Sequence, residues 1–289
     1  MTSSWMLVAG FFFAAMGVIV KHGSGDFDST EMAFYRSIVG FAFISAIIVA
    51  RKGSVRTPRL SGHVIRSVVG TVSLIGYYHA MTLLPLATAQ TLNYTSPIFL
   101  AIATVVVLGE KFSGWLVVAI AVGFGGVALL LQPTIGEGKE APALIGLFSG
   151  VFAAWAYLSV RTLSKLGEPD YRVVFYFSGI GSVLCAGWQL ATSHFHPITW
   201  SNLWVVIGIG FCGLVAQLAM TRAYRTGNTL VVGALSYSTL VFSSLATFLI
   251  WGERLPGAEV AGMAIIVVSG IMAMRVERKE EVEEAGFES

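Results

Sequence analysis

Long apolar runs separated by short polar connections form most of the chain. The runs cover about ten stretches, at 4–21, 32–50, 64–84, 88–108, 113–131, 142–161, 171–192, 202–224, 229–250 and 256–275. Each is close to the ~20 residues that a helix needs to cross ~30 Å of hydrocarbon. The connections leave no room for a soluble domain. The pattern predicts an all-α integral membrane protein with about ten transmembrane helices.

Composition agrees with a membrane protein. The chain is 55% hydrophobic and 12% charged, whereas a soluble domain carries about 25% charged residues. The first run has no basic segment before it and no small-residue cleavage site after it, so we expect a retained span rather than a signal peptide. Cys185 and Cys212 both fall inside apolar runs, so no disulfide framework is expected.

The basic residues predict an orientation. With the N-terminus inside, 14 of the 18 Lys and Arg residues fall on the inner side, Arg66 among them, leaving Lys21, Arg36, Lys139 and Arg254 outside. Cytoplasmic loops carry such an excess of positive charge. We therefore expect a multi-pass protein of a bacterial inner membrane with both termini in the cytoplasm. Because the basic residues cluster at span ends, no nucleic-acid partner is expected.

The chain also repeats itself. The segment "NYTSPIFLAIATVVVLGEKFSG" (93–114) aligns without gaps with "SYSTLVFSSLATFLIWGERLPG" (236–257), and weaker echoes link "FYRSIVG" (34–40) to "FYFSGIG" (175–181). Each half holds about five spans, and an odd number inserts the halves in opposite directions. The predicted organisation is a first repeat over 1–133, an inverted repeat over 142–275 and a charged cytoplasmic tail over 276–289. Inverted repeats are typical of secondary transporters, with the substrate site near the midplane.

These motifs give the chain a family resemblance. The duplicated "F…A-T…G-E-K/R…G" segments and the approach "YYHAMTLLPLATA" (77–89) resemble the drug/metabolite transporter superfamily, in its ten-helix branch built from two EamA-type halves. The "YYHAMTLLPLA" element looks most like bacterial aromatic amino-acid exporters. The resemblance implies export of small organic metabolites. The first span lacks the glutamate that the four-helix multidrug pumps of this superfamily carry there, so antiport of cationic drugs driven by such a group is disfavoured.

Polar side chains inside the spans are the candidate site, because such groups usually face a bundle interior or a wet cavity. Equivalent polar stripes run along the fourth and ninth spans, with small-residue helix packing as the alternative for their Ser and Thr members. His79 is a candidate for proton coupling, or a histidine satisfied by a neighbouring helix. Trp155 is either a wall for an aromatic substrate or lipid-facing packing. The predicted substrate-binding residues are Tyr78, His79, Thr82, Gln90, Asn93, Tyr94, Trp155, Gln217, Tyr224, Ser236 and Tyr237.

Other polar residues receive structural interpretations. Lys21 is expected to extend toward the membrane surface rather than to bind substrate. Arg222 and Arg225 are expected to anchor the cytoplasmic end of their span. Glu110 and Glu253 are expected to cap helix ends in both repeats.

The functional expectation is a metabolite exporter that works by alternating access, with aromatic or other neutral amino acids as the leading substrates. A multidrug or nucleoside exporter is the alternative. An intramembrane enzyme is disfavoured, because "GSGD" (23–26) has no partner aspartate in a second span. No cofactor or metal is expected, and the partners are a small-molecule substrate and the lipid bilayer. The oligomeric state, with a monomer as the working expectation, and the energy coupling stay open.

Overall fold

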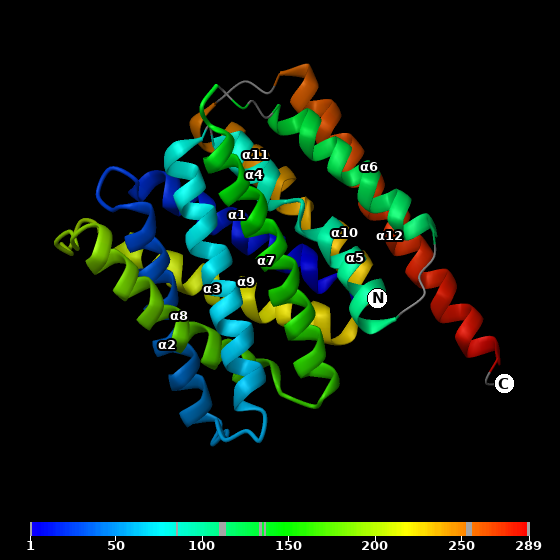
Figure 1. Ribbon diagram of the computed structural model, residues 1–289, viewed down its shortest axis with the longest axis horizontal. Coiled ribbons are helices and arrows are strands. Elements are labelled where there is room, and N and C mark those ends of the chain that lie inside the picture. Colours follow the sequence, from blue (N-terminus) through cyan, green and yellow to red (C-terminus); the bar gives the residue numbers. More distant parts are fainter. Residues whose placement is uncertain are drawn as a thin grey trace.

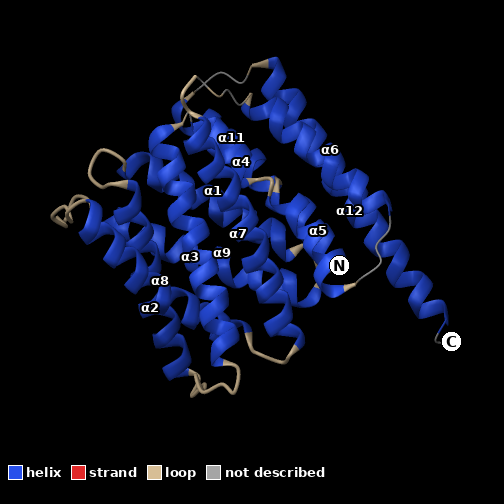
Figure 2. Ribbon diagram, in the orientation of Figure 1, coloured by secondary structure: helices blue, strands red, loops and turns tan. Residues whose placement is uncertain are grey.

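The chain forms a bundle of helices joined by loops, and the part that the structure describes contains no strand (Figure 2). The computed structural model describes residues 2–84, 86–109, 114–132, 135, 137–252 and 256–287. For residues 81, 82, 86, 87, 108, 251 and 276–287 it describes the backbone alone.

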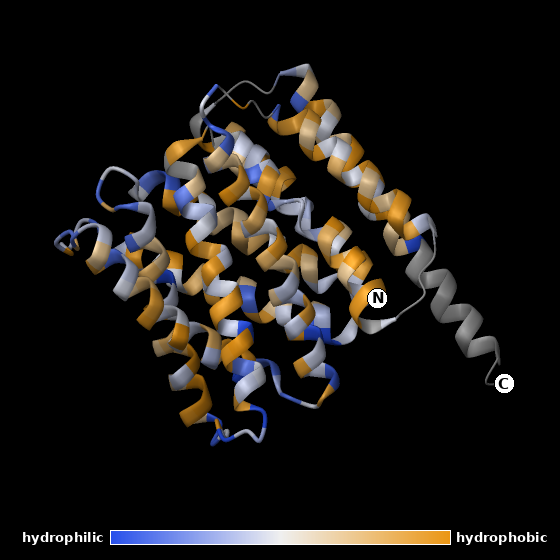
Figure 3. Ribbon diagram, viewed as in Figure 1, coloured by the Kyte–Doolittle hydropathy of each residue, from blue (hydrophilic) through white to orange (hydrophobic). Residues whose placement is uncertain are grey.

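The helices follow the predicted spans closely (Figure 1). They are α1 (Trp5–Gly23), α2 (Ser29–Ala50), α3 (Leu60–Leu83), α4 (Leu86–Asn93), α5 (Ser96–Leu108), α6 (Gly114–Leu131), α7 (Glu140–Lys165), α8 (Asp170–Thr192), α9 (Leu203–Thr226), α10 (Thr229–Ser236), α11 (Ser238–Trp251) and α12 (Gly257–Phe287). Hydrophilic residues gather in the connections, while the helices are mostly apolar (Figure 3).

Within the described residues, nine segments are long and apolar enough to cross a membrane. The predicted span at 64–84 corresponds to α3, which has 24 residues but is not among the nine. Its sequence carries His63, Arg66 and His79 among its apolar residues. The all-helical architecture predicted from the apolar runs is confirmed.

Two predicted spans are interrupted near their middles. The span at 88–108 is α4 followed by α5, with Tyr94 and Thr95 between them, and Pro97 lies at the start of α5. The equivalent span at 229–250 is α10 followed by α11, interrupted at Tyr237. Both second pieces end at a glycine in the left-handed region, Gly109 at φ 64° and Gly252 at φ 65°, a conformation that L side chains rarely adopt. The duplicated motif therefore builds the same local structure twice.

The second helices of the two halves, α2 and α8, lie side by side and run antiparallel. The beginning of α2 meets the end of α8, where Thr30 hydrogen-bonds to Gln189. The beginning of α8 meets the loop after α2, where Tyr176 donates to the carbonyl of Val55 over 3.0 Å. Because these helices hold equivalent places in the repeats, their antiparallel packing agrees with an inverted arrangement.

The first and third helices of the two halves also pack across the repeats. Helix α1 of the first repeat packs along α9 of the second. The equivalent pair, α7 of the second repeat and α3 of the first, packs in the same manner. Helices α6 and α12 pair with each other along one side of the bundle (Figure 1). A Cβ at Gly262 would lie 2.7 Å from the backbone nitrogen of Leu130, so this pair depends on glycine for its close approach.

Candidate functional site

A group of tyrosines from both repeats lies where the interrupted helices meet. Tyr94 and Tyr237, at the two interruptions, have ring centroids 6.3 Å apart. Tyr157 of α7 stacks on Tyr224 of α9 at 5.2 Å and 17°. Tyr94 lies within hydrogen-bonding reach of Thr239. The structure thus brings together the predicted residues Tyr94, Tyr224 and Tyr237.

Gln90 and Tyr77 form a polar contact between neighbouring helices of the first repeat. The Gln90 side chain hydrogen-bonds with Tyr77. Tyr77 and Tyr157 were absent from the predicted site. Their signal in the sequence is weak, because a tyrosine within a span is as easily a packing residue.

Asn93 and Ser236, both predicted to line a cavity, are hydrogen-bonded within the protein. Asn93 donates from Nδ2 to Ser149 of α7 over 3.0 Å. Ser236 donates to the carbonyl of Gly233 over 2.6 Å, and Thr104 to that of Leu100 over 2.8 Å. Both Ser236 and Thr104 thus bond to a carbonyl of their own helix, and both are buried.

Tyr78 and His79 face the α2–α8 pair. Tyr78 is buried against Ala33 and Cys185, and the His79 ring lies 6.4 Å from that of Trp188. Pro85, Glu110 and Glu253 lie outside the described residues, as does the side chain of Thr82.

Trp155 does not join the tyrosine group. Its side chain is 57% exposed, on the same helical stripe as the exposed Leu144, Phe148 and Phe152. A continuous apolar exposed stripe on a membrane-spanning helix faces lipid. Of the two interpretations of Trp155, this position fits lipid-facing packing.

Residues at the end of α9 and α1 fit the expected anchoring roles. The Arg222 guanidinium lies 5.0 Å from the ring centroid of Trp5, and Arg225 pairs with Asp170 over 3.2 Å. Lys21 is exposed in the last turn of α1.

Two arginines counted as residues of the span ends lie within the bundle instead. Arg66 of α3 is only 2% exposed, and its guanidinium carbon is 4.0 Å from the ring centroid of Phe177 in α8. Arg36 of α2 contacts Gln217 of α9, its Nη2 donating to Oε1 over 3.4 Å. Gln217, a predicted site residue, is 4% exposed. The Lys/Arg count assigned Arg66 to the inner side and Arg36 to the outer side, and such a count cannot tell a charge exposed at a helix end from one turned into the protein.

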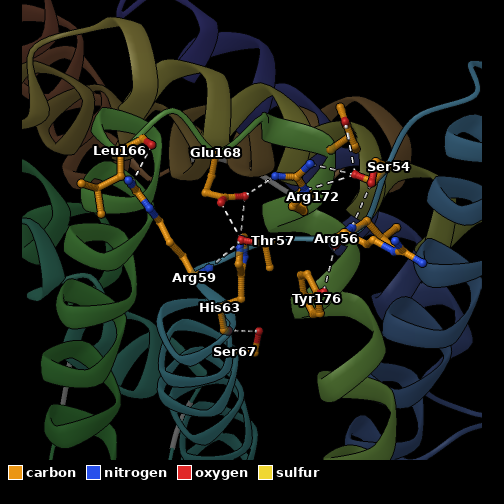
Figure 4. A network of polar contacts seen from close by, with 12 residues as sticks. Ser54, Arg56, Thr57, Arg59, His63, Ser67, Leu166, Glu168, Arg172 and Tyr176 are labelled. Carbon is orange, nitrogen blue, oxygen red and sulfur yellow. Dashed lines mark hydrogen bonds and ion pairs between the residues drawn. The ribbon is translucent and has the colours of Figure 1, made fainter.

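The Glu168 cluster joins the two repeats at one end of the α2–α8 pair (Figure 4). We use this name for Glu168, Thr57, His63 and Arg172. Glu168 precedes α8 and accepts from Thr57 over 2.6 Å and from Arg172 over 2.7 Å, with His63 Nε2 at 3.1 Å. Burial opposes ionisation of Glu168, but these hydrogen bonds outweigh it and hold the pKa of its carboxyl at about 2. The charged cluster ties the loop before α8 to the loop after α2.

The Glu31 cluster, which comprises Glu31, Tyr35, Asp28, His196 and Ser193, joins the repeats at the other end of the pair. Glu31 is fully buried and lies 2.8 Å from His196 Nδ1, while Tyr35 donates to its other oxygen over 2.7 Å. Ser193 donates to Asp28 over 2.9 Å. The hydrogen bond with Glu31 raises the pKa of His196.

Asp28, Glu31 and His196 place one ligand atom each within 4.8 Å of one another, a geometry that a metal ion also accepts. Sequence spacing did not reveal this group, since His196 lies 165 positions from Glu31. Both Glu31 oxygens already accept hydrogen bonds, so the arrangement is complete as a clamp between the repeats.

An apolar groove lies apart from these polar groups, between α5 and α6. Its volume is about 350 Å³, and it is lined by Ile98, Ala101, Ile102, Val105, Val106, Val117, Ile120 and Ala121. It presents no polar side chain, so it suits hydrocarbon rather than a polar metabolite.

Comparison with known proteins identifies the family. The profile of the EamA-like transporter family matches residues 1–132 and 141–275, one match for each repeat. The chain belongs to this family. It is therefore a membrane transporter, as the repeat and the resemblance predicted.

Individual relatives cover nearly the whole chain. It is 29% identical over 282 residues to a pseudopaline exporter of Pseudomonas aeruginosa, covering 94% of this chain and 95% of that protein. It is 27% identical over 286 residues to a riboflavin transporter of Vibrio cholerae, covering 96% and 93%. A solved crystal structure of another protein superposes on this chain with a TM-score of 0.83 at 20% identity. The match covers 96% of this chain and 98% of that one, which shows a shared fold. The relatives act on chemically different molecules, so the finer likeness to aromatic amino-acid exporters stays a prediction.

Proposed function

We propose that this protein exports small organic metabolites across a bacterial inner membrane, acting as a monomer with both termini in the cytoplasm. Neutral and aromatic amino acids are the leading substrate class. Transport proceeds by alternating access, in which the two repeats rock about a site between them.

The Glu31 and Glu168 clusters are the observation that carries this proposal. Each joins one repeat to the other, and they lie at opposite ends of the antiparallel α2–α8 pair. A transporter needs a closure at each side of the membrane that opens while the other stays shut. Two clusters of the same chemistry, a buried glutamate with a histidine from the opposite repeat, supply that pair of closures.

The interior between these closures supports a small polar substrate with an apolar part. The tyrosine group offers aromatic faces and hydroxyls, and Arg36 and Gln217 lie on the α2–α9 side. A strongly cationic substrate is disfavoured, because its positive charge would lose its water shell beside Arg36 and Arg66.

Flux into liposomes tests the proposal. Purified protein in proteoliposomes would be screened with labelled amino acids, riboflavin, nucleosides and a cationic dye, with and without a pH gradient. We expect flux of one or more amino acids above that of empty liposomes. Flux of riboflavin or nucleosides alone would keep the metabolite exporter but replace amino acids as its substrate class. Flux of the dye alone would contradict the proposal.

A further inference from the structure

Arg66 is a buried cation without a counter-ion. Its Nε and Nη1 atoms have no hydrogen-bond partner, and its guanidinium rests on the Phe177 ring. Among the residues that the structure describes, no acidic side chain forms an ion pair with it. A buried charge that lacks a partner is strongly destabilising, and an ionisable residue inside a membrane protein usually marks a functional site.

Arg36 and Gln217 add donors next to Phe177. Both line a small cavity together with Phe177, Ser37 and Ser178, and its volume of about 10 Å³ holds about one water molecule. The Nε2 amide of Gln217 is buried and has no partner, and the hydrogen bond from Arg36 is long at 3.4 Å. Donors of Arg66 and Gln217 at this place therefore lack a partner, and that of Arg36 has only a weak one.

We propose that Arg66, Arg36 and Gln217 bind the carboxylate group of the transported substrate. The inference rests on the proposed transport function and narrows it to organic carboxylates, amino acids included. A carboxylate matches the planar fork of a guanidinium with two parallel hydrogen bonds. It would supply both the missing charge and the missing acceptors. Because the cavity admits only water in the closed arrangement, the carboxylate binds when one of the two clusters has opened and Phe177 has moved aside.

Thermal unfolding of the purified protein in detergent tests this with three probes of similar size at equal ionic strength: benzoate, benzamide and phenylphosphonate. Benzoate at several times its Kd is expected to raise the Tm of the wild type by about 2–4 °C, with a smaller shift for benzamide. The same benzoate shift is expected in Arg222→Gln, a matched control that removes an exposed arginine, and its loss is expected in Arg66→Gln. Equal shifts with benzoate and benzamide, stabilisation by phenylphosphonate alone, or an undiminished benzoate shift in Arg66→Gln would overturn the inference.

Arg66→Met keeps the test decisive if Arg66→Gln does not fold. Methionine has a similar length without the charge, and replacing an uncompensated buried charge by an apolar group is often neutral or stabilising. We expect the ligand-free Tm of Arg66→Met to equal or exceed that of the wild type, with no benzoate shift. A marked fall in the ligand-free Tm would instead assign Arg66 a structural role and overturn the inference.

The flux assay separates this inference from the proposed function. Amino-acid flux that is equal in wild type and Arg66→Gln would leave the transporter intact and remove the carboxylate site. Absence of any flux in the wild type would remove the proposed function, whereas the benzoate comparison would still decide whether a carboxylate binds at Arg66.

Discussion

Glu31 and Glu168 each face a histidine of the opposite repeat, His196 at 2.8 Å and His63 at 3.1 Å, at opposite ends of the α2–α8 pair. Both carboxylates are nearly inaccessible to solvent, and each accepts further hydrogen bonds. The same chemistry thus joins the repeats at both ends of the α2–α8 pair. The surroundings differ, because Glu168 also pairs with Arg172.

Replacing Glu168 should weaken the end of the bundle that it closes. Glu168→Gln removes the negative charge that pairs with Arg172, while the Arg172 guanidinium still donates to the carbonyl of Ser54. Loss of a hydrogen bond to a charged group costs about 1.5–3 kcal/mol. Since the pKa of Glu168 falls from 4.5 to about 2 on folding, its ionised form stabilises the protein above pH 4.5. This contribution is lost as the pH falls from about 4.5 toward 2.

Thermal unfolding of wild type and Glu168→Gln between pH 7 and pH 3 would measure this effect. The difference in Tm should be large at pH 7 and should shrink as the pH approaches 3. Arg225→Gln breaks the exposed pair with Asp170 within the second repeat and serves as the control, with an expected cost of about 0–1 kcal/mol. A difference that does not vary with pH would contradict the role assigned to the ionised carboxylate.

His196 should make the end at the Glu31 cluster less stable as the pH rises, whereas the Glu168 cluster loses stability as the pH falls. Glu31 raises the pKa of His196 above 6.5, so the pairing is fully present below pH 6.5 and is lost as the pH rises through the raised value. We expect the end closed by the Glu31 cluster to open more readily at alkaline pH. Labelling of a cysteine at Ser193 in a background without Cys185 and Cys212 would follow the opening. His196→Gln should remove the pH dependence, and a retained dependence would exclude His196 as its source.

Two substitutions of Tyr237 distinguish a packing role of its ring from a substrate-binding role of its hydroxyl. Its side chain is fully buried, and its hydroxyl has no hydrogen-bond partner. Tyr237→Phe should leave stability unchanged or raise it by about 1 kcal/mol, whereas Tyr237→Ala should cost about 3–5 kcal/mol through the cavity it leaves. If the hydroxyl binds substrate, Tyr237→Phe will reduce flux at unchanged stability. Wild-type flux in Tyr237→Phe would limit Tyr237 to packing.

Trp155 and Tyr157 lie two positions apart and point to different surroundings. Trp155 faces outward, while Tyr157 stacks on Tyr224. Trp155→Ala should therefore retain most of the flux, whereas Tyr157→Ala should reduce it several-fold through the loss of the stacked pair. Flux per folded molecule in proteoliposomes makes the comparison. The reverse order would restore Trp155 as a wall of the substrate site.

The sequence was sufficient for the spans and the duplication, and insufficient for the contacts between repeats. Apolar runs near 20 residues predict membrane helices because the bilayer fixes their length, and the repeated "G-E-K/R" segment revealed the two halves. No proline lies at the interruption at Tyr237, so the sequence gives no local signal for it. The pairing of Glu31 with His196 joins segments 165 positions apart, and no local pattern encodes such a contact. Arg66 lies near a helix end in the sequence, and only packing shows that its side chain is buried.

Cross-linking across each cluster tests most directly whether the two ends must open in turn. In a background without Cys185 and Cys212, one variant would carry Asp28→Cys with Ser193→Cys, and another Thr57→Cys with Glu168→Cys, each joined by a short bis-maleimide. A third variant, Asp170→Cys with Arg225→Cys, links residues within one repeat and is the control. We predict that either cross-link between the repeats abolishes the flux that the same variant shows before the reagent is added, while the control retains its flux. Flux that survives a completed cross-link at both clusters would contradict alternating access about the α2–α8 pair.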